Sequence, residues 1–327
     1  MRLIPGRKSL IRYAEDIVDI SREATTIFNT YFAEEPRVDH IVYSARRRET
    51  IDKTSAVIIG DNNQLWGYIW AWNTGRRNVP KLVYPRIRYS LPPSDKKKVL
   101  ETLLAWTRKT IGMETRKIRI VTGPLDLYTR HLLQTIIRSP INWQPETHLV
   151  VLENIKQHTN HVKPSKEIQL EKVDPRNNNK VLKEIVEIYN DSFLDYPEYS
   201  EWKIDEAKHY YEKLYTWSKP IVIIARRNRE AVGYAEAYTH NSATGISGLV
   251  TTIAVKKKYR KQGYGKLLLE EAEEELLGRG AQTVYLYAED PVLGFYKLHG
   301  YRVVYTSYNI TVYIDELPID IYYSVEE

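Results

Sequence analysis

Cysteine is absent from all 327 residues, and methionine occurs only twice. Without cysteine the chain cannot form a disulfide, a thiolate metal site or a covalent cysteine intermediate. Long apolar runs are also missing: the run at 221–225 is far too short to cross a membrane, and the first residues lack the apolar core of a signal peptide. We therefore expect a soluble, cytoplasmic protein with no membrane partner.

Charge of one sign is in slight excess, because the net charge is +6 with basic clusters at 46–48, 96–98 and 256–258. A basic chain suggests a nucleic-acid partner, but no RNP, zinc-finger or helix-turn-helix signature supports one. The clusters are equally explained by solvated turns and by one patch that meets a polyanionic cofactor. The scarcity of cysteine and methionine, with 28% charged residues, suggests a thermophilic source.

Histidine gives no sign of a metal site. The eight histidines show no HxxxH or HxH spacing with nearby carboxylates, so we expect no bound metal.

The most informative stretch runs from Ser247 to Gly265. An apolar, β-branched run at 249–255 predicts a strand, and the leucine and alanine spacing of 266–278 predicts an amphipathic helix. Between them lies a basic turn with glycines at 263 and 265. The predicted order is therefore strand, glycine-containing turn, helix.

This order suits an anion. The first amides of a helix lack partners within the helix and lie at the positive end of its dipole. Glycine removes the Cβ atoms that would keep a phosphate away from the backbone. The spacing, Arg260-x-x-Gly263-x-Gly265, differs from the GxGxxG of a dinucleotide fold and from a P-loop. A strand-to-helix turn that merely uses glycine is the alternative.

The spacing resembles the acetyl-CoA pyrophosphate loop of the GNAT N-acetyltransferase superfamily. A second motif follows, in which a helix carrying Tyr296 ends at Gly300 and leads into the strand residue Tyr301. Glu289 departs from the asparagine that the family often has. The resemblance covers residues 247–305 and implies a cofactor-binding set of Ile253, Ala254, Val255, Arg260, Lys261, Gln262, Gly263, Tyr264, Gly265 and Lys266.

The two halves of the chain repeat one pattern. Gly67 corresponds to Gly233 (233 − 67 = 166), Pro124 to Pro291 (291 − 124 = 167) and Tyr128 to Tyr296 (296 − 128 = 168). A hairpin, a strand, a helix, a strand, a helix and a strand recur in this order, which indicates an internal duplication. The fold class that we expect is α/β with mixed sheets, as two tandem GNAT-like domains at 1–155 and 167–327 joined by a linker at 156–166. This layout is similar to that of mycothiol synthase and related tandem proteins.

The first copy differs where chemistry would occur. At the offset of 168, Arg260, Gly263 and Gly265 correspond to Pro92, Asp95 and Lys97. A carboxylate at the start of the helix repels pyrophosphate and caps the amides itself. We therefore expect the N-terminal domain to be degenerate.

Two residues are candidates for catalysis. Tyr296 matches the general acid of the family, because a phenol with a pKa of about 10 is protonated at neutral pH. Glu236 is the candidate base, since alternation places it on one strand face with Tyr234 and Tyr238. His240 is an alternative base. Tyr296 as a packing tyrosine and Glu236 as an exposed strand acid remain open.

The segment after the first helix of the second domain is rich in acids and aromatics. The resemblance places it over the acceptor, so Asp195, Tyr196 and Glu198 are candidate substrate-binding residues for a cationic amine. These acids are equally explained as keeping an exposed loop soluble.

Three functional hypotheses follow. The first is an acetyl-CoA-dependent N-acyltransferase that moves the acetyl group directly to a primary amine of a small molecule or protein. The second is a CoA-binding sensor or scaffold without turnover. The third is a basic protein associated with nucleic acid.

Overall fold

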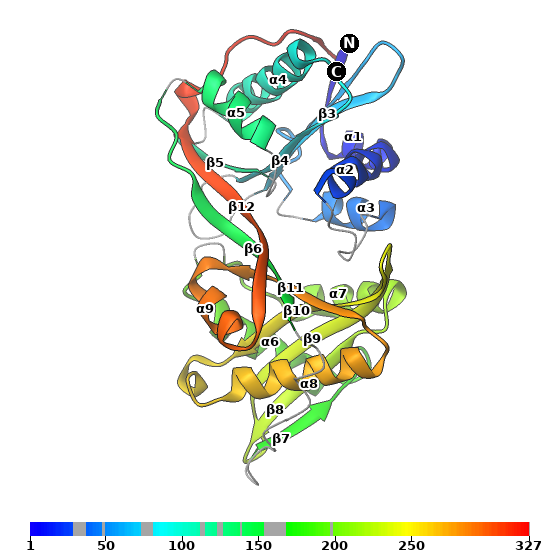
Figure 1. Cartoon of the computed structure of the whole chain (residues 1–327), viewed down its shortest axis with the longest axis vertical. Helices are drawn as coiled ribbons and strands as arrows, with labels where there is room; N and C mark the ends of the chain where they lie inside the picture. The colour runs from blue at the N-terminus through cyan, green and yellow to red at the C-terminus, as the bar shows by residue number, and fades with distance from the viewer. Residues whose placement is uncertain are drawn as a thin grey trace. The chain divides into compact units, whose positions relative to one another are not determined.

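A computed structural model describes residues 1–28, 37–47, 50–72, 81–111, 115–122, 127–137, 139–153, 168–196 and 199–326. The residues form two compact units (Figure 1). The expected linker at 156–166, Pro124 and Glu198 lie outside the described residues. No described helix is both long enough and apolar enough to cross a bilayer.

The first unit combines the beginning of the chain with its end. Its helices are α1 (Arg7–Arg12), α2 (Ala14–Phe28), α3 (Val38–Arg46), α4 (Pro93–Ile111) and α5 (Leu127–Ile136). Its strands are β1 (Arg2–Pro5), β2 (Ala56–Ile59), β3 (Leu65–Trp72), β4 (Lys81–Ile87), β5 (Lys117–Thr122) and β13 (Ser324–Val325). The strand order is β13-β1-β2-β3-β4-β5, followed by the end of β12 (Tyr301–Tyr313), which pairs antiparallel with β5.

The second unit repeats this topology. Its helices are α6 (Asn179–Phe193), α7 (Ile204–Trp217), α8 (Tyr264–Gly278) and α9 (Asp290–Leu298). Its strands are β7 (Ile168–Lys172), β8 (Ile221–Arg227), β9 (Glu230–Ser242), β10 (Gly245–Val255) and β11 (Thr283–Glu289). The order is β7-β8-β9-β10-β11, followed by the end of β6 (Gln144–Leu152).

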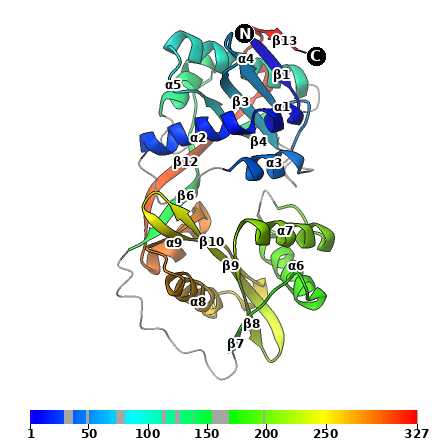
Figure 2. The same cartoon turned by 90° about the vertical axis from the view of Figure 1, so that its right-hand side faces the viewer.

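Each sheet has one apolar face packed on a long helix. In the second unit α8 buries Leu268, Leu269 and Leu276 against β8 to β11, and Figure 2 shows α6 and α7 on the opposite face. In the first unit α4 packs on one face of the sheet and α1 and α2 on the other. The α/β fold with mixed sheets is therefore confirmed.

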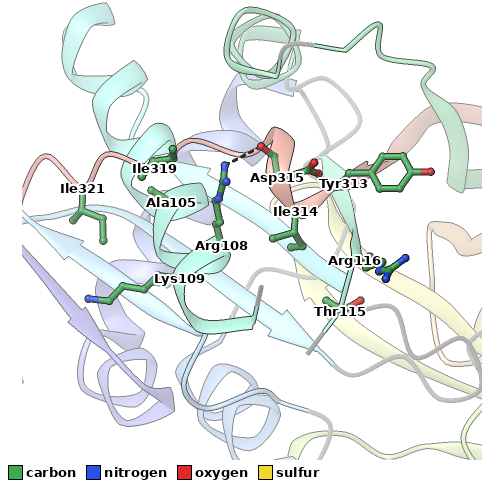
Figure 3. A pocket seen from close by; sticks show the side chains of 10 residues that line it. All are labelled: Ala105, Arg108, Lys109, Thr115, Arg116, Tyr313, Ile314, Asp315, Ile319 and Ile321. Atoms are coloured by element: carbon green, nitrogen blue, oxygen red, sulfur yellow. Dashed lines mark hydrogen bonds between the residues drawn. The ribbon is translucent and has the colours of Figure 1, made fainter. Parts of the chain in front are cut away.

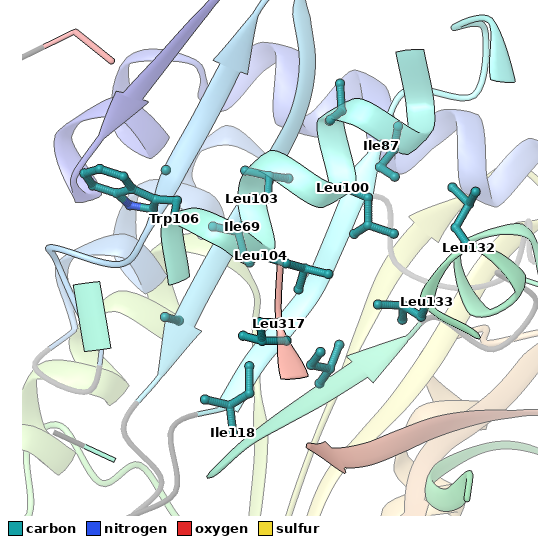
Figure 4. Close-up of a cluster of buried hydrophobic side chains, with 14 of the residues drawn as sticks. Ile69, Ile87, Leu100, Leu103, Leu104, Trp106, Ile118, Leu132, Leu133 and Leu317 are labelled. Carbon is teal, nitrogen blue, oxygen red and sulfur yellow. The ribbon is translucent and has the colours of Figure 1, made fainter. Parts of the chain in front are cut away.

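Part of the last strand of each repeat lies in the other unit. Residues 305–327 belong to the first unit, and residues 148–152 of β6 belong to the second. The observed division thus differs from the expected boundary at 155–167. The reason is burial: Ile310, Val312, Ile314 and Leu317 are part of the first unit's core, with Leu317 beside Leu104 and Ile118 in Figure 4.

The same C-terminal segment lines a pocket of about 730 Å³ in the first unit (Figure 3). Arg108 of α4 donates there to the carbonyl oxygens of Asp315 and Leu317, at 2.8 and 2.6 Å. The two bonds fix the chain end on α4.

Two separate helices follow β1. Tyr13 is the C-cap of α1, and α2 begins at the next residue, Ala14. The strand expected at 249–255 and the helix expected at 266–278 are present as parts of β10 and α8.

Equivalent contacts support the duplication. A Cβ on Gly67 would lie 2.6 Å from Val99 of α4 and 2.8 Å from the Arg86 carbonyl, and a Cβ on Gly233 would lie 3.0 Å from Leu268 of α8 and 2.8 Å from the Ala254 carbonyl. Both glycines let a helix and the next strand approach the backbone closely.

A second equivalent contact joins a helix to a strand end. The Glu23 carboxylate of α2 accepts from the amide of Tyr89, and the Asp191 carboxylate of α6 accepts from the amide of Lys257, at 3.1 and 2.5 Å. Both members are offset by 168 residues (191 − 23 and 257 − 89).

Truncating a C-terminal side chain tests the packing of residues 305–327 in the first unit. We expect Ile310→Ala to lower the unfolding free energy by about 2–4 kcal/mol, because this isoleucine is only 2% exposed in the core. Ile319→Ala is the matched control, since Ile319 is 73% exposed and its truncation should cost at most about 0.5 kcal/mol. Urea unfolding measures both variants, and equal losses would contradict the packing.

Candidate active site

The site begins where two parallel strands part. β10 pairs with β11 only from Ser247 to Val250, opposite residues 283–286, although β10 continues to Val255. Residues 252–255 keep their pairing with β9, and a register shift makes Thr251 the bulge residue. Among residues 199–326, the segment Ile253–Val255 therefore has a β9 partner on one edge and no β11 partner on the other. An extended ligand can pair with such an edge.

The turn after β10 leads directly into α8. Lys261 and Gly263 take positive φ values of 58° and 87°, and Gly263 is the N-cap without any side-chain cap. A Cβ on Gly263 would project into open space, whereas one on Gly265 would touch the Phe295 ring at 3.6 Å. No acidic residue lies in the first turn of α8. The first amides of α8 are thus presented at an open surface suited to an anion.

The basic residues of this turn are largely paired. Lys258 and Lys256 lie 2.9 and 3.8 Å from Glu230, and Lys257 lies 2.7 Å from Asp195. These pairs reduce the positive charge that suggested a nucleic-acid partner.

Arg260 acts as a brace within this turn. Its guanidinium donates to the carbonyl oxygen of Val255 at 3.3 Å and to that of Ser192 at the end of α6. The sequence placed this side chain beside a phosphate; in the structure it holds two backbone segments. Gln262 similarly donates to the Lys258 carbonyl oxygen at 2.9 Å, and Lys266 lies 3.7 Å from Glu270.

Glu236 is buried directly beside the parting strands. It is 2% exposed, and its Oε1 accepts from the hydroxyls of Tyr210 at 2.6 Å and Thr251 at 2.7 Å. Burial raises the pKa of Glu236, and the two hydroxyl donors oppose that rise. The carboxyl lies among tyrosines, as alternation predicted, but it is not an exposed strand acid.

Tyr210 and Thr251 were not predicted as members of the site. Burial and the Glu236 charge raise the pKa of Tyr210, which keeps its hydroxyl a donor. Only the tertiary fold brings α7 and the bulge to β9, so no sequence spacing identified them.

His240, the alternative base, lies farther along β9. Its Nε2 is 2.9 Å from the hydroxyl of Tyr285, and its Nδ1 is 3.1 Å from the Asn241 carbonyl oxygen. Both ring nitrogens have hydrogen-bond partners, as Glu236 does, and His240 stays the alternative base.

Tyr296 lies on α9 and packs on the core that contains α8. Its ring lies edge-on to Phe295 and to Tyr301, with centroids 5.1 and 5.8 Å apart. Burial, with a smaller effect of Tyr196, raises the pKa of Tyr296. The phenol therefore stays protonated across the neutral range.

The predicted acceptor segment is only partly as expected. Tyr196 packs edge-on against Phe193, at 5.3 Å between centroids, while Asp195 pairs with Lys257. Asp195 is therefore not an isolated carboxylate awaiting a cation.

The corresponding site of the first unit is filled. Trp70 occupies the position of Glu236 (236 − 70 = 166) and donates from Nε1 to Thr50. Arg88 pairs with Glu23 at 2.9 Å, and Asp95 lies in the first turn of α4. Among the described residues of the first unit, the counterparts of Glu236 and Gly263 are thus an indole and an acid. Among the described residues, no cluster of three or more histidines and acids has the geometry of a metal site.

Comparison with known proteins agrees with this architecture. Residues 182–301 match the model of the Acetyltransferase (GNAT) family. No curated protein matches the sequence significantly.

Solved structures resemble nearly the whole chain. A tandem GNAT protein from the clavulanic acid biosynthesis pathway is 14% identical, with a TM-score of 0.68 over 96% of this chain and 98% of that one. A GCN5-related N-acetyltransferase from Sphaerobacter thermophilus is 13% identical, with a TM-score of 0.62 over 95% of each chain. An acetyltransferase of the GNAT family from Colwellia psychrerythraea is 12% identical, with a TM-score of 0.56 over 90% of this chain and 96% of that one.

The fold is therefore that of the tandem GNAT proteins. Its second unit contains a GNAT domain, and the layout is that of tandem GNAT proteins. The family uses acetyl-CoA, and the open amides at the start of α8 fit its pyrophosphate.

Removing the Tyr210 hydroxyl tests the charge of Glu236. We expect Tyr210→Phe to lower the unfolding free energy by about 1.5–3 kcal/mol where Glu236 is ionised, because a bond to a charged acceptor is lost. Because the pKa of Glu236 is raised in the folded protein, its carboxyl stays protonated there at pH values at which the unfolded chain has already released the proton. Stability therefore falls as pH rises through the folded pKa, and the variant should fall more steeply.

Unfolding at about pH 5 and about pH 8 measures this effect, with a larger loss expected at the higher pH. Tyr287→Phe is the control, because Tyr287 is 49% exposed on the same sheet. Equal losses at both pH values would show that the bond to Tyr210 does not depend on ionisation.

Proposed function

We propose that this protein is an N-acetyltransferase that moves the acetyl group of acetyl-CoA directly to a primary amine, using only its second unit. The observation that carries the proposal is the parting of β10 from β11 immediately before the uncapped, glycine-containing start of α8. An extended thioester arm and its pyrophosphate need these two features side by side. The family match at 182–301 supports the same reading.

The cofactor-binding residues have distinct tasks in this proposal. Acetyl-CoA supplies an activated acetyl carbonyl and a thiolate leaving group. Amides of Tyr264, Gly265 and Lys266 hold the pyrophosphate, and the exposed edge of Ile253–Val255 aligns the extended arm. A backbone amide in that edge stabilises the oxyanion that develops on the carbonyl.

Two side chains handle the protons. Glu236 takes a proton, directly or through water, from the attacking amine as the C–N bond forms. Tyr296 gives a proton to the sulfur as the C–S bond breaks. The raised pKa of Glu236 suits a base that must accept a proton near neutral pH, and the raised pKa of Tyr296 keeps that phenol protonated.

A second candidate function is CoA binding without turnover. The observation that favours it is that the hydroxyls of Tyr210 and Thr251 already donate hydrogen bonds to Glu236. They occupy the carboxylate oxygen that a substrate amine would otherwise contact. Mixing the protein with acetyl-CoA and a panel of small amines and lysine peptides separates the two. Release of free thiol, together with an acetylated product detected by mass spectrometry, supports acetyl transfer. Binding of acetyl-CoA without free thiol or acetylated product supports the sensor function.

Cofactor binding should depend on the start of α8, where Gly263 lies, and not on the equivalent start of α4, where Asp95 lies. We expect Gly263→Asp to weaken CoA binding by at least about 100-fold, because the new carboxylate would lie in the open space before α8 and repel phosphate. Asp95→Ala in the first unit should leave the affinity unchanged. Isothermal calorimetry measures both, with Gly278→Asp at the far end of α8 as a charge control. CoA bound to the first unit would refute the assignment.

Tyr296→Phe removes the proton donor and keeps the ring. We expect kcat to fall by roughly 10²-fold with little change in the KM for acetyl-CoA. Single-turnover kinetics make the chemical step visible. An unchanged rate there would make Tyr296 a packing residue only.

The acceptor that we propose is a cationic primary amine. Since Lys257 neutralises Asp195, Asp195→Asn leaves a lysine charge near the acceptor segment. We expect the KM for a cationic amine to rise by roughly 3–5-fold, which corresponds to the modest energy of a surface pair. The KM for acetyl-CoA should stay constant, and Asp205→Asn on α7 is the control. A lower KM for the amine would mean that Asp195 does not favour cations.

A further inference from the structure

One buried acid has no place in the mechanism above. Glu273 is only 2% exposed on α8, on the face that buries Leu269, Ala272 and Leu276. A carboxyl in an apolar core is costly unless it is hydrogen-bonded. Its bonding partner therefore indicates what the residue does.

That partner is Tyr301, the first residue of β12. The Tyr301 hydroxyl donates to Glu273 Oε1 at 2.7 Å. The Tyr301 ring in turn lies edge-on to the ring of Tyr296, with centroids 5.8 Å apart and planes at 71°. Tyr301 thus contacts the buried acid with its hydroxyl and the proposed proton donor with its ring.

Few charged groups face Glu273. Glu270 lies one turn earlier on α8. The Nζ of Lys266 is 3.7 Å from the Oε1 of Glu270. The core residues that β6 and β11 contribute around Tyr301 are apolar, namely Val150, Leu152, Val284 and Leu286. Arg302, the next residue of β12, pairs with Glu153 at 3.1 Å on the other strand face.

This environment makes Glu273 sensitive to pH. Burial, with a smaller effect of Glu270, raises the pKa of Glu273 to about 7, against the opposing effect of the Tyr301 hydroxyl. The bond from Tyr301 is charge-assisted, and therefore stronger, when the carboxyl is ionised.

We propose that Glu273 and Tyr301 are positioning residues for Tyr296: the carboxyl fixes the Tyr301 ring, and that ring fixes the phenol of Tyr296. The inference rests on the proposed function only where it gives Tyr296 the role of proton donor. As Glu273 ionises, Tyr301 is held more tightly and Tyr296 has a narrower range of positions. The device links the pose of the acid to pH without any contact between Glu273 and substrate.

The direct test is the ring environment of Tyr296 in the full-length protein. When all tyrosine rings are labelled with ¹³C, each tyrosine contributes NMR signals. The signal that is lost in Tyr296→Phe belongs to Tyr296. We expect this signal to shift with a midpoint near the pKa of about 7 in the wild type. The shift should vanish in Glu273→Gln and persist in Glu274→Gln, an exposed neighbour on the same helix. A shift that persists in Glu273→Gln, or none in the wild type, overturns the proposal.

Kinetics give an independent readout. Tyr301→Phe keeps the ring and removes the hydroxyl, so we expect kcat to fall by roughly 3–10-fold with the KM for acetyl-CoA within about 2-fold. Glu273→Gln should reduce the rise in kcat between about pH 6 and about pH 8 to the part that ionisation of the base Glu236 supplies, whereas Glu274→Gln should retain the full rise. A loss confined to KM in Tyr301→Phe would contradict positioning of the acid.

The two proposals fail in different ways. Absence of transfer to every amine refutes the acetyltransferase function, while the NMR titration still decides whether Glu273 and Tyr301 position Tyr296.

Discussion

The parting of β10 from β11 is the constraint on which the second unit depends. A parallel pair that stayed in register to its end would leave no edge for an extended ligand. The bulge at Thr251 occurs just after the last shared pair, Val250 with Leu286. The same residue donates to Glu236, so one irregularity lies where β10 leaves β11 and also holds the carboxyl beside it.

Local features of the site could be predicted from the sequence because they depend on neighbours in the chain. Gly263 lies in the turn at the start of a helix, and Tyr296 lies on a short helix before a strand, as their spacing indicated. Other features depend on contacts between distant residues. The bonds from Tyr210 to Glu236 and from Lys257 to Asp195 join elements whose meeting no periodicity predicts. The placement of residues 305–327 in the first unit was hidden for the same reason.

The two repeats keep a common frame and differ in what occupies it. Glu23 and Asp191 make the same bond to a strand end, 168 residues apart. Where the second unit has Glu236 and Gly263, the first has Trp70 and Asp95. A buried indole and an acidic first helical turn thus take the positions of Glu236 and Gly263 in the first unit. The two repeats therefore share their packing and differ, among the described residues, in the side chains at these two positions.

Completion of the first unit by the chain's last residues reverses the usual order of events on the ribosome. Its core needs Ile310 and Leu317, which are made about 190 residues after β5. At about 5–20 residues per second this interval lasts roughly 10–40 s. The strand residues 148–152 of β6, which belong to the second unit, are synthesised before the rest of that unit. The core of the N-terminal unit is thus completed only after Val304, the last residue of the C-terminal unit, has been made.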